Sequence, residues 1–278
     1  MRTIALLTEY DGTRFLGWQS QREGRTIQNE LESALSVLFE QPIRLYGCSR
    51  TDAGVHAIGH VSHFKASGSI PSDRIPLALS AILPEDIAVR LAVEMPETFH
   101  ARYGARAKRY TYRIWNTRIR SAITRQTVFH EPRPLDLGAM RQAALLLTGR
   151  HDFSAFMAAG GKTATTVRTL MDVRVDRIPG DPTIKITVTG DGFLYNMVRI
   201  LSGTLLYAGL GKIRPEDLPE ILLSGDRRRA GKTLPAKGLT LEAVYYEQDG
   251  RLATLSGDVL ELAANGGESA PGGYEHGL

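Results

Sequence analysis

The stretch "RAKRYTYRIWN", residues 106–116, decides the fold prediction because it starts a second pass through one order of elements. Two tyrosines, Tyr110 and Tyr112, alternate along this basic stretch and so share one side, as side chains of a β-strand do. A strand is also predicted at 2–11, and in each case a segment with helical spacing comes next. The chain is therefore predicted to contain two units of the same topology.

The first unit has the order strand, helix, strand, strand, helix, strand. Apolar residues at helical spacing predict a helix at 26–41, with Thr26 as its N-cap. The rest of the unit is predicted as strands at 43–49 and 55–66, a short helix near 73–83 and a strand at 87–95.

The second unit repeats this order after a basic stretch. Its predicted segments are a strand at 106–116, a helix at 137–149, a hairpin of strands at 167–178 and 183–190, a helix at 193–211 with Asp191 as its cap, and a strand at 239–248. Two βαββαβ units in tandem predict an α+β fold made of two ferredoxin-like halves. We expect their antiparallel sheets to join into a central sheet with helices on one face and an active-site cleft between the halves.

The expected division is an N-terminal ferredoxin-like domain at 1–104 that carries the Asp52 loop, a C-terminal ferredoxin-like domain at 105–248, and a flexible acidic, Gly-rich tail at 249–278. The sequence has one cysteine, Cys48, which excludes an intramolecular disulfide. With no long apolar run and no signal-peptide pattern, we expect no membrane segment and a cytoplasmic location.

The positive charge is concentrated in one part of the chain. Residues 98–130 contain no acid and eight cations, namely Arg102, Arg106, Lys108, Arg109, Arg113, Arg118, Arg120 and Arg125. Arginine suits phosphate oxygens and stacks on bases, so a nucleic-acid partner is one interpretation and a merely solvated basic face is the other. Tyr110 and Tyr112 share a face of the basic strand, where they are either a base-stacking surface or ordinary core tyrosines.

Asp52 lies in "GCSRTDAGVHAIGH", residues 47–60, between two predicted strands. The segment Arg50-Thr51-Asp52 is then a loop at strand ends, a common place for site residues, although Asp before Ala-Gly also closes ordinary turns. Arg199 is a lone arginine on a mostly apolar helix and needs a buried partner, for which Asp52 is a candidate.

The nearby histidines do not predict a metal site. In a strand, His56 and His60 share a face while His63 points the other way, and a three-histidine site needs all three to converge. The sequence also lacks a complete phosphate loop, a dinucleotide-binding fingerprint and a serine-hydrolase elbow, so no cofactor is implied.

Seven motifs in order resemble one known family. They are "YDGTRFLGWQSQ" (10–21), "GCSRTDAGVHA" (47–57), "AKRYTYRI" (107–114), "HDFSAF" (151–156), "TVRTL" (166–170), "GFLYNMVRILSG" (192–203) and "PAKGLTLEAVYYE" (235–247). Together they resemble the tRNA pseudouridine synthase A (TruA) family. The resemblance implies isomerisation of uridine to pseudouridine in the tRNA anticodon stem-loop, typically at positions 38 to 40. It also implies a homodimer that needs neither metal nor cofactor.

The resemblance also implies roles for four residues. Asp52 matches the nucleophile, which acts at uracil C6, at ribose C1′ or through a glycal intermediate. Arg50 matches the arginine that helps to flip the uridine, Tyr110 the tyrosine that packs against the base, and Arg199 the partner of the carboxylate. The sequence departs from the family pattern at Ser49, where Gly is common, and at Asn196, where His is common, and we expect neither departure to touch these four roles. A non-catalytic RNA-binding module is the alternative function.

Overall fold

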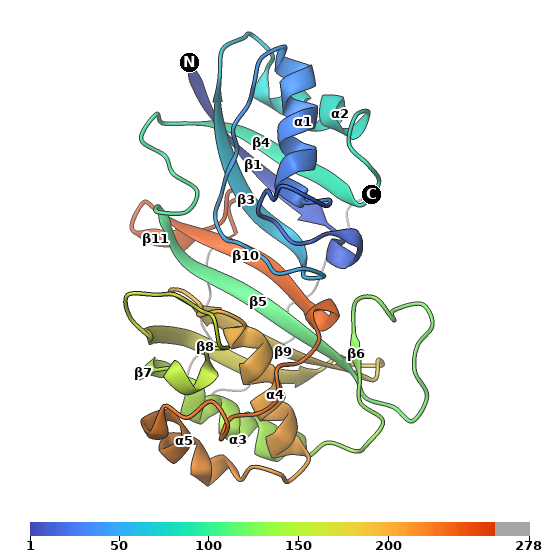
Figure 1. The fold of residues 1–278 in the computed structure, drawn as a ribbon, viewed down its shortest axis with the longest axis vertical. Helices are drawn as coiled ribbons and strands as arrows, with labels where there is room; N and C mark the ends of the chain where they lie inside the picture. Colours follow the sequence, from blue (N-terminus) through green and yellow to red (C-terminus); the bar gives the residue numbers. More distant parts are fainter. Residues whose placement is uncertain (259–278) are drawn as a thin grey trace.

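The computed structural model describes residues 1–258, which form an α+β fold around one continuous mixed sheet (Figure 1). The main strand order is β4-β1-β3-β10-β5-β9-β8-β7, with β2 and β11 paired to the sides of β3 and β10 and β6 to β5. The α+β class and the joined central sheet are therefore confirmed. Among the described residues, no helix is both long and apolar enough to cross a membrane.

The elements follow the chain in two runs. The first contains β1 (Arg2–Tyr10), α1 (Ile27–Phe39), β2 (Tyr46–Gly47), β3 (His56–Ala66), α2 (Ile75–Ser80) and β4 (Ile87–Met95). The second contains β5 (Ala105–Trp115), β6 (Phe129–His130), α3 (Leu137–Leu147), β7 (Gly149–Asp152), β8 (Val167–Arg177), β9 (Thr183–Gly190), α4 (Met197–Gly209), α5 (Leu218–Ser224), β10 (Leu239–Gln248) and β11 (Arg251–Ala253).

The two runs meet where β3 lies beside β10. This pairing is parallel, with His56 opposite Thr240 and Ala57 opposite Leu241, whereas β1 pairs antiparallel with both β3 and β4, and β5 with both β10 and β9. The backbones approach closely just beyond the pairing, because a Cβ added to Gly59 would lie 2.1 Å from the carbonyl oxygen of Glu242. The last long strand of the chain thus joins the halves.

Most predicted elements are confirmed, and helix α1 shows why. Thr26 caps it by accepting a hydrogen bond from the Asn29 amide at 3.3 Å. Its residues Ile27, Leu31 and Leu35 are fully buried in the core, as the helical spacing of apolar residues predicts. The bounds of β4, β9 and β10 also agree with the predicted strands at 87–95, 183–190 and 239–248.

The strand predicted at 43–49 is wrong for most of its length, since only Tyr46–Gly47 pairs with β3. The amides before it bond to α1 instead: the Ile43 amide donates to the Ser36 hydroxyl at 3.0 Å, and the Leu45 amide to the Glu32 carboxylate at 2.8 Å. Side chains of the helix thus supply the acceptors that a strand would find in a neighbouring strand.

The helix predicted at 193–211 begins only at Met197, and Asp191 does not cap it. Asn196 has the left-handed backbone conformation, φ 59°, immediately before the helix, and asparagine tolerates it better than most residues. Asp191 accepts from the Thr169 amide at 3.0 Å instead. At the other end of the chain, β11 continues the sheet into the predicted tail, and the rest of that tail, 259–278, lies outside the described residues.

The variant Gly59→Ala tests the close contact between β3 and β10 at the junction of the two halves. The added methyl group would force the β3 and β10 backbones apart, so we expect the free energy of unfolding to fall by about 1–3 kcal/mol in urea titrations. The control is Gly192→Ala, whose Cβ would meet only the Arg168 side chain at an ordinary 3.4 Å. Equal stability of the two variants would contradict a close junction.

Candidate active site

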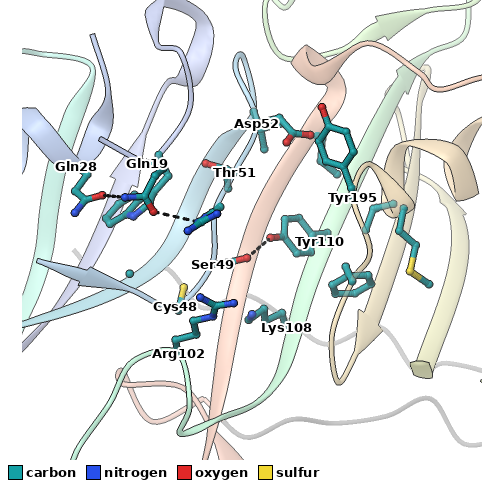
Figure 2. A pocket seen from close by; sticks show the side chains of 18 of the residues that line it. Gln19, Gln28, Cys48, Ser49, Thr51, Asp52, Arg102, Lys108, Tyr110 and Tyr195 are labelled. Atoms are coloured by element: carbon teal, nitrogen blue, oxygen red, sulfur yellow. Dashed lines mark hydrogen bonds between the residues drawn. The ribbon is translucent and has the colours of Figure 1, made fainter. Parts of the chain in front are cut away.

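A cavity of about 860 Å³ lies between the two halves of the chain. The first half contributes the loop of residues 47–52, and the second contributes β5 and the segment 193–199, which leads into α4. Figure 2 shows Asp52, Ser49 and Tyr110 directed into this space from opposite sides. All four predicted site residues, Arg50, Asp52, Tyr110 and Arg199, line it.

The expected pairing of Asp52 with Arg199 is present in the structure. Arg199 Nη1 donates to Asp52 Oδ2 at 3.2 Å, and their side chains are 18% and 34% exposed, respectively. Arg199 is fixed by two further bonds, from Nε to the Leu234 carbonyl at 2.8 Å and from Nη1 to the Asn196 amide oxygen at 2.6 Å. The guanidinium thus holds one orientation of the carboxylate at the cavity wall.

The cavity lining is strongly cationic. Its basic side chains are Arg44, Arg50, Arg102, Lys108 and Arg199. Within residues 1–258, Asp52 is the only acid that lines the cavity. A potential of one sign in a recessed site attracts a polyanion, and a single carboxylate in such a site is a candidate for chemistry.

Tyr110 forms the wall opposite Asp52 and is 6% exposed. Its hydroxyl lies 3.3 Å from the Ser49 hydroxyl, and its ring packs edge-to-face against Phe193 with centroids 5.2 Å apart. Burial raises the pKa of Tyr110, and the charge of Asp52 adds to the rise. Tyr112 is instead a core residue, fully buried, and its hydroxyl donates to the Pro235 carbonyl; a base-stacking role for Tyr112 is therefore wrong.

Arg50 differs from the other three residues because its side chain is exposed at the cavity wall. Its Nε donates to the Gln19 side chain at 3.1 Å, and the same Gln19 donates to Gln28 (Figure 2). A neutral, single hydrogen bond leaves the guanidinium free to exchange partners at low cost.

The Asp52 loop is held from behind by the segment that follows β1. The Trp18 amide donates to the Thr51 carbonyl at 3.1 Å, and the Gly54 amide to the Phe15 carbonyl at 3.4 Å. Gly17 has φ +98°, and a Cβ there would lie 2.4 Å from the Thr51 carbonyl oxygen. The quoted motif at 10–21 therefore has a physical role as the support of the loop.

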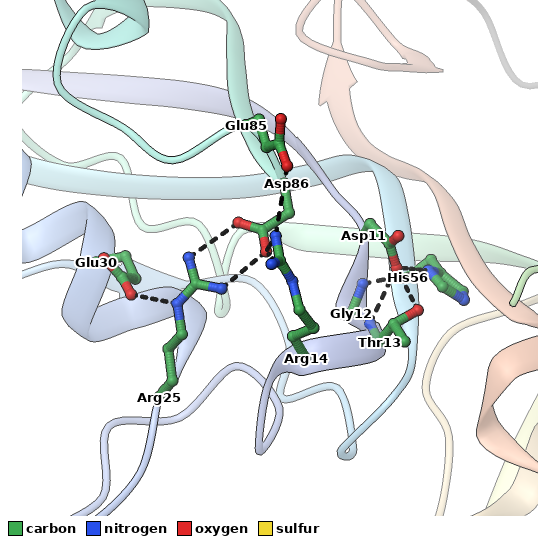
Figure 3. Close-up of polar contacts among 9 residues, drawn as sticks. All are labelled: Asp11, Gly12, Thr13, Arg14, Arg25, Glu30, His56, Glu85 and Asp86. Carbon is green, nitrogen blue, oxygen red and sulfur yellow. Dashed lines mark hydrogen bonds and ion pairs between the residues drawn. The ribbon is translucent and has the colours of Figure 1, made fainter.

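This support is itself tied to the start of β4 (Figure 3). Asp86, almost fully buried, accepts from Arg14 at 2.8 Å and from Arg25 through both carboxylate oxygens. These arginines hold the pKa of Asp86 below its ordinary value against the effect of burial. The two ends of the supporting segment are thus fixed at one carboxylate.

The three histidines of β3 do not converge. His60 stacks on Trp18 with ring centroids 3.6 Å apart, and its Nε2–H donates to the Ser49 carbonyl at 3.1 Å. His63 contacts Tyr46 and His100, and His56 accepts from the Gly12 amide. In residues 1–258, no group of three His, Cys, Asp or Glu residues is placed to bind a metal.

The two departures from the family pattern do touch the predicted site, so our expectation was wrong. Ser49 contacts the Tyr110 hydroxyl, and Asn196 accepts from Arg199, the partner of Asp52. Sequence position suggested neither contact, because both depend on residues from the other half or on the left-handed turn before α4.

Only a small part of the basic segment 98–130 enters the cavity. Successive residues of a strand point to opposite faces, so Lys108 lies on the Tyr110 face and Arg113 on the other. Arg113 lies within 3.5 Å of Glu242, away from the cavity. Of the eight cations at 98–130, only Arg102 and Lys108 line the cavity.

Comparison with known proteins shows the family of this chain. A model of the tRNA pseudouridine synthase family matches residues 6–104 and 143–247. The chain belongs to this family. It is therefore an enzyme of the kind that isomerises uridine to pseudouridine in tRNA, and a non-catalytic RNA-binding module is excluded.

Individual relatives resemble the chain along nearly their whole length. Proteins named tRNA pseudouridine synthase A from Acetivibrio thermocellus and Ruminiclostridium cellulolyticum are each 46% identical over 246 residues, which is 88% of this chain and 100% of theirs. A Clostridium perfringens protein named tRNA pseudouridine synthase A 2 is 44% identical over the same shares. The matched length includes both walls of the cavity.

His60 provides a pH test of the loop support in this synthase. Burial lowers the pKa of His60 to about 3, whereas an unfolded histidine titrates near 6.5. Below about pH 6.5, His60 binds a proton in the unfolded chain but stays neutral in the folded protein. The free energy of unfolding therefore falls by about 1.4 kcal/mol per pH unit.

His60→Gln keeps an N–H donor for the Ser49 carbonyl and does not titrate. We expect its free energy of unfolding, measured in urea, to fall less steeply than that of the parent between pH 6 and pH 4. His63, whose pKa burial lowers to about 4, is present in both proteins and cancels in the comparison. Parallel profiles over this range would show that His60 is not a buried neutral group.

Proposed function

We propose that the cavity binds a uridine of the tRNA anticodon stem-loop, typically at positions 38 to 40, and that Asp52 is the nucleophile. The observation that carries the proposal is that, among the described residues that line the cavity, Asp52 is the only acid beside five basic side chains. A negative nucleic-acid backbone fits such a lining, and the isomerisation requires one reactive carboxylate beside the base.

The proposed reaction conserves all atoms of the nucleotide. Asp52 adds to ribose C1′ or to uracil C6, the N1–C1′ bond breaks, and the uracil rotates within the cavity. C5 then bonds to C1′, Asp52 is released, and the proton on C5 leaves while N1 gains one. A redox partner is not needed at any step, and the enclosed space keeps the detached base next to the ribose.

Arg199 is proposed to orient Asp52. Its Nη1 donates to Asp52 Oδ2 at 3.2 Å and so holds the carboxylate in one direction at the cavity wall. Because Arg199 is also bonded to the Leu234 carbonyl and to Asn196, it is already in place before the substrate binds. That pre-organisation supports a positioning role rather than direct contact with the reacting atoms.

Tyr110 and Arg50 are proposed to receive and release the base. The Tyr110 ring borders the cavity opposite Asp52, where a flipped uracil can pack against it. The Tyr110 hydroxyl, which lies 3.3 Å from the Ser49 hydroxyl, is proposed to assist the removal of the proton from C5. Arg50, with its single contact to Gln19, is suited to fill the space that the flipped base leaves.

The architecture supports two finer proposals. Residues 1–104 and 105–248 are two ferredoxin-like domains. The strand orders β4-β1-β3-β2 and β10-β5-β9-β8 both place the fourth, first, third and second strand of a βαββαβ unit side by side, in that spatial order. The family resemblance supports a homodimer in which both subunits contribute to the RNA cleft.

Asp52→Asn tests the nucleophile. The amide cannot form the covalent adduct, so we expect release of tritium from tRNA carrying 5-tritiated uridine to fall to background while the Kd for tRNA changes less than threefold. Asp73→Asn is a matched control on an exposed carboxylate outside the cavity. Tritium release by Asp52→Asn at the parent rate would remove Asp52 from the chemistry.

Arg199→Ala tests the pairing. Loss of the guanidinium frees Asp52 to turn away from the base, and misplacement of a reacting group by about 1 Å can cost about 100-fold in rate. We therefore expect kcat, measured by single-turnover tritium release, to fall by about 100-fold with tRNA affinity nearly unchanged. Arg113→Ala, on the opposite face of β5, is the control; a similar kcat for both variants would argue against the pairing.

A further inference from the structure

Lys108 points into the cavity without any partner of opposite charge. It lies on β5 on the same face as Tyr110 and is half-buried. Its neighbours on the adjacent strands are Val244 and Gly190, which carry no charge. Within residues 1–258, the Lys108 ammonium forms no hydrogen bond or ion pair, whereas the ammonium groups of Lys65 and Lys185 lie 3.3 and 3.1 Å from the carboxylates of Glu97 and Glu242, respectively.

A second cation is directed at Lys108. Figure 2 shows Arg102 and Lys108 facing one another below the Ser49–Tyr110 hydrogen bond, with Asp52 above it. Among the described residues, the Arg102 guanidinium contacts only the Tyr103 ring, at 5.8 Å from the ring centroid. Burial lowers the pKa of Lys108, and the charge of Arg102 lowers it further.

Two converging cations destabilise the free protein. A recessed ammonium loses hydration, and a like charge beside it adds repulsion. Asp52, the one acid among the described residues of the lining, is already paired with Arg199. The buried Cys48 thiol is neutral, because burial raises its pKa to about 11. The described lining therefore contains no group that balances the two charges.

We propose that Lys108 and Arg102 bind a phosphate group of the RNA strand that carries the target uridine. The ammonium and the guanidinium would each donate to phosphate oxygens, with the base above them between Asp52 and Tyr110. This inference rests on the proposed function, which makes RNA the ligand of the cavity. The part of the cavity next to Arg102 and Lys108 would then hold the backbone of the substrate, and the part between Asp52 and Tyr110 would hold the base.

The first test needs no RNA. In Lys108→Met the unpaired charge is replaced by an apolar side chain of similar length, so we expect the Tm of the free protein to rise by about 2–4 °C. Inorganic phosphate at 50 mM should raise the Tm of the parent and leave that of Lys108→Met almost unchanged. Lys212→Met, at an exposed position outside the cavity, should respond to phosphate as the parent does.

The second test measures tRNA affinity between about 50 and 200 mM salt. Each phosphate contact contributes roughly 0.7–0.9 to the slope of log Kd against log salt. We expect Lys108→Met to bind about tenfold more weakly at low salt with a slope lower by about 1, and Arg102→Met to show the same change. Lys108→Arg, which keeps the charge, should keep the slope of the parent, as should Lys212→Met.

The outcomes separate this inference from the proposed function. A lower Tm or misfolding of Lys108→Met would make Lys108 a structural residue, and an unchanged salt slope would remove it from RNA binding; either result overturns the inference. Tritium release by the parent tests the proposed function alone. If the parent modifies no anticodon stem-loop uridine while the Lys108→Met slope still falls, only the proposed function fails.

Discussion

The parallel pairing of β3 with β10 places Asp52 and Arg199, 147 residues apart in sequence, at 3.2 Å. Asp52 lies in the loop that leads into β3, and Arg199 lies in α4, in the half of the chain to which β10 belongs. A shift of one residue in this pairing would move every side chain of β3 to the other face of the sheet. The geometry of the site therefore depends on the register between the two halves.

The rest of the structure keeps the loop from moving once the halves are joined. The segment after β1 supports it with backbone hydrogen bonds, Asp86 fixes that segment through two arginines, and His60 holds the Ser49 carbonyl from the other side. The rigid frame leaves Arg50, with a single contact to a neutral side chain, as the adaptable member of the site.

Local patterns were enough to predict most of the fold, because alternation, helical spacing and capping depend on neighbouring residues. The roles expected of Arg50, Asp52, Tyr110 and Arg199 came from the family resemblance, and the structure places all four side chains around one cavity. These local patterns failed where contacts with residues distant in the sequence determine the local structure. The 43–49 strand is replaced by hydrogen bonds to α1, and the start of α4 is set by the left-handed Asn196. The roles of Ser49 and Asn196 were missed for the same reason, since their contacts are fixed by the tertiary structure. The direction of each cation on β5 could have been read from strand alternation, but the partners across the sheet could not.

The position of β10 affects the order in which the molecule is assembled. This strand is formed by residues 239–248 and lies between β3 and β5, which are made much earlier. While a growing chain lacks it, both earlier strands have an unpaired edge at the centre of the future sheet, where another chain can pair. Synthesis at about 5–20 residues per second leaves those edges open for several seconds or more. A nascent chain is thus most vulnerable to aggregation just before its last long strand emerges, and it acquires its catalytic geometry in the same step that closes the gap.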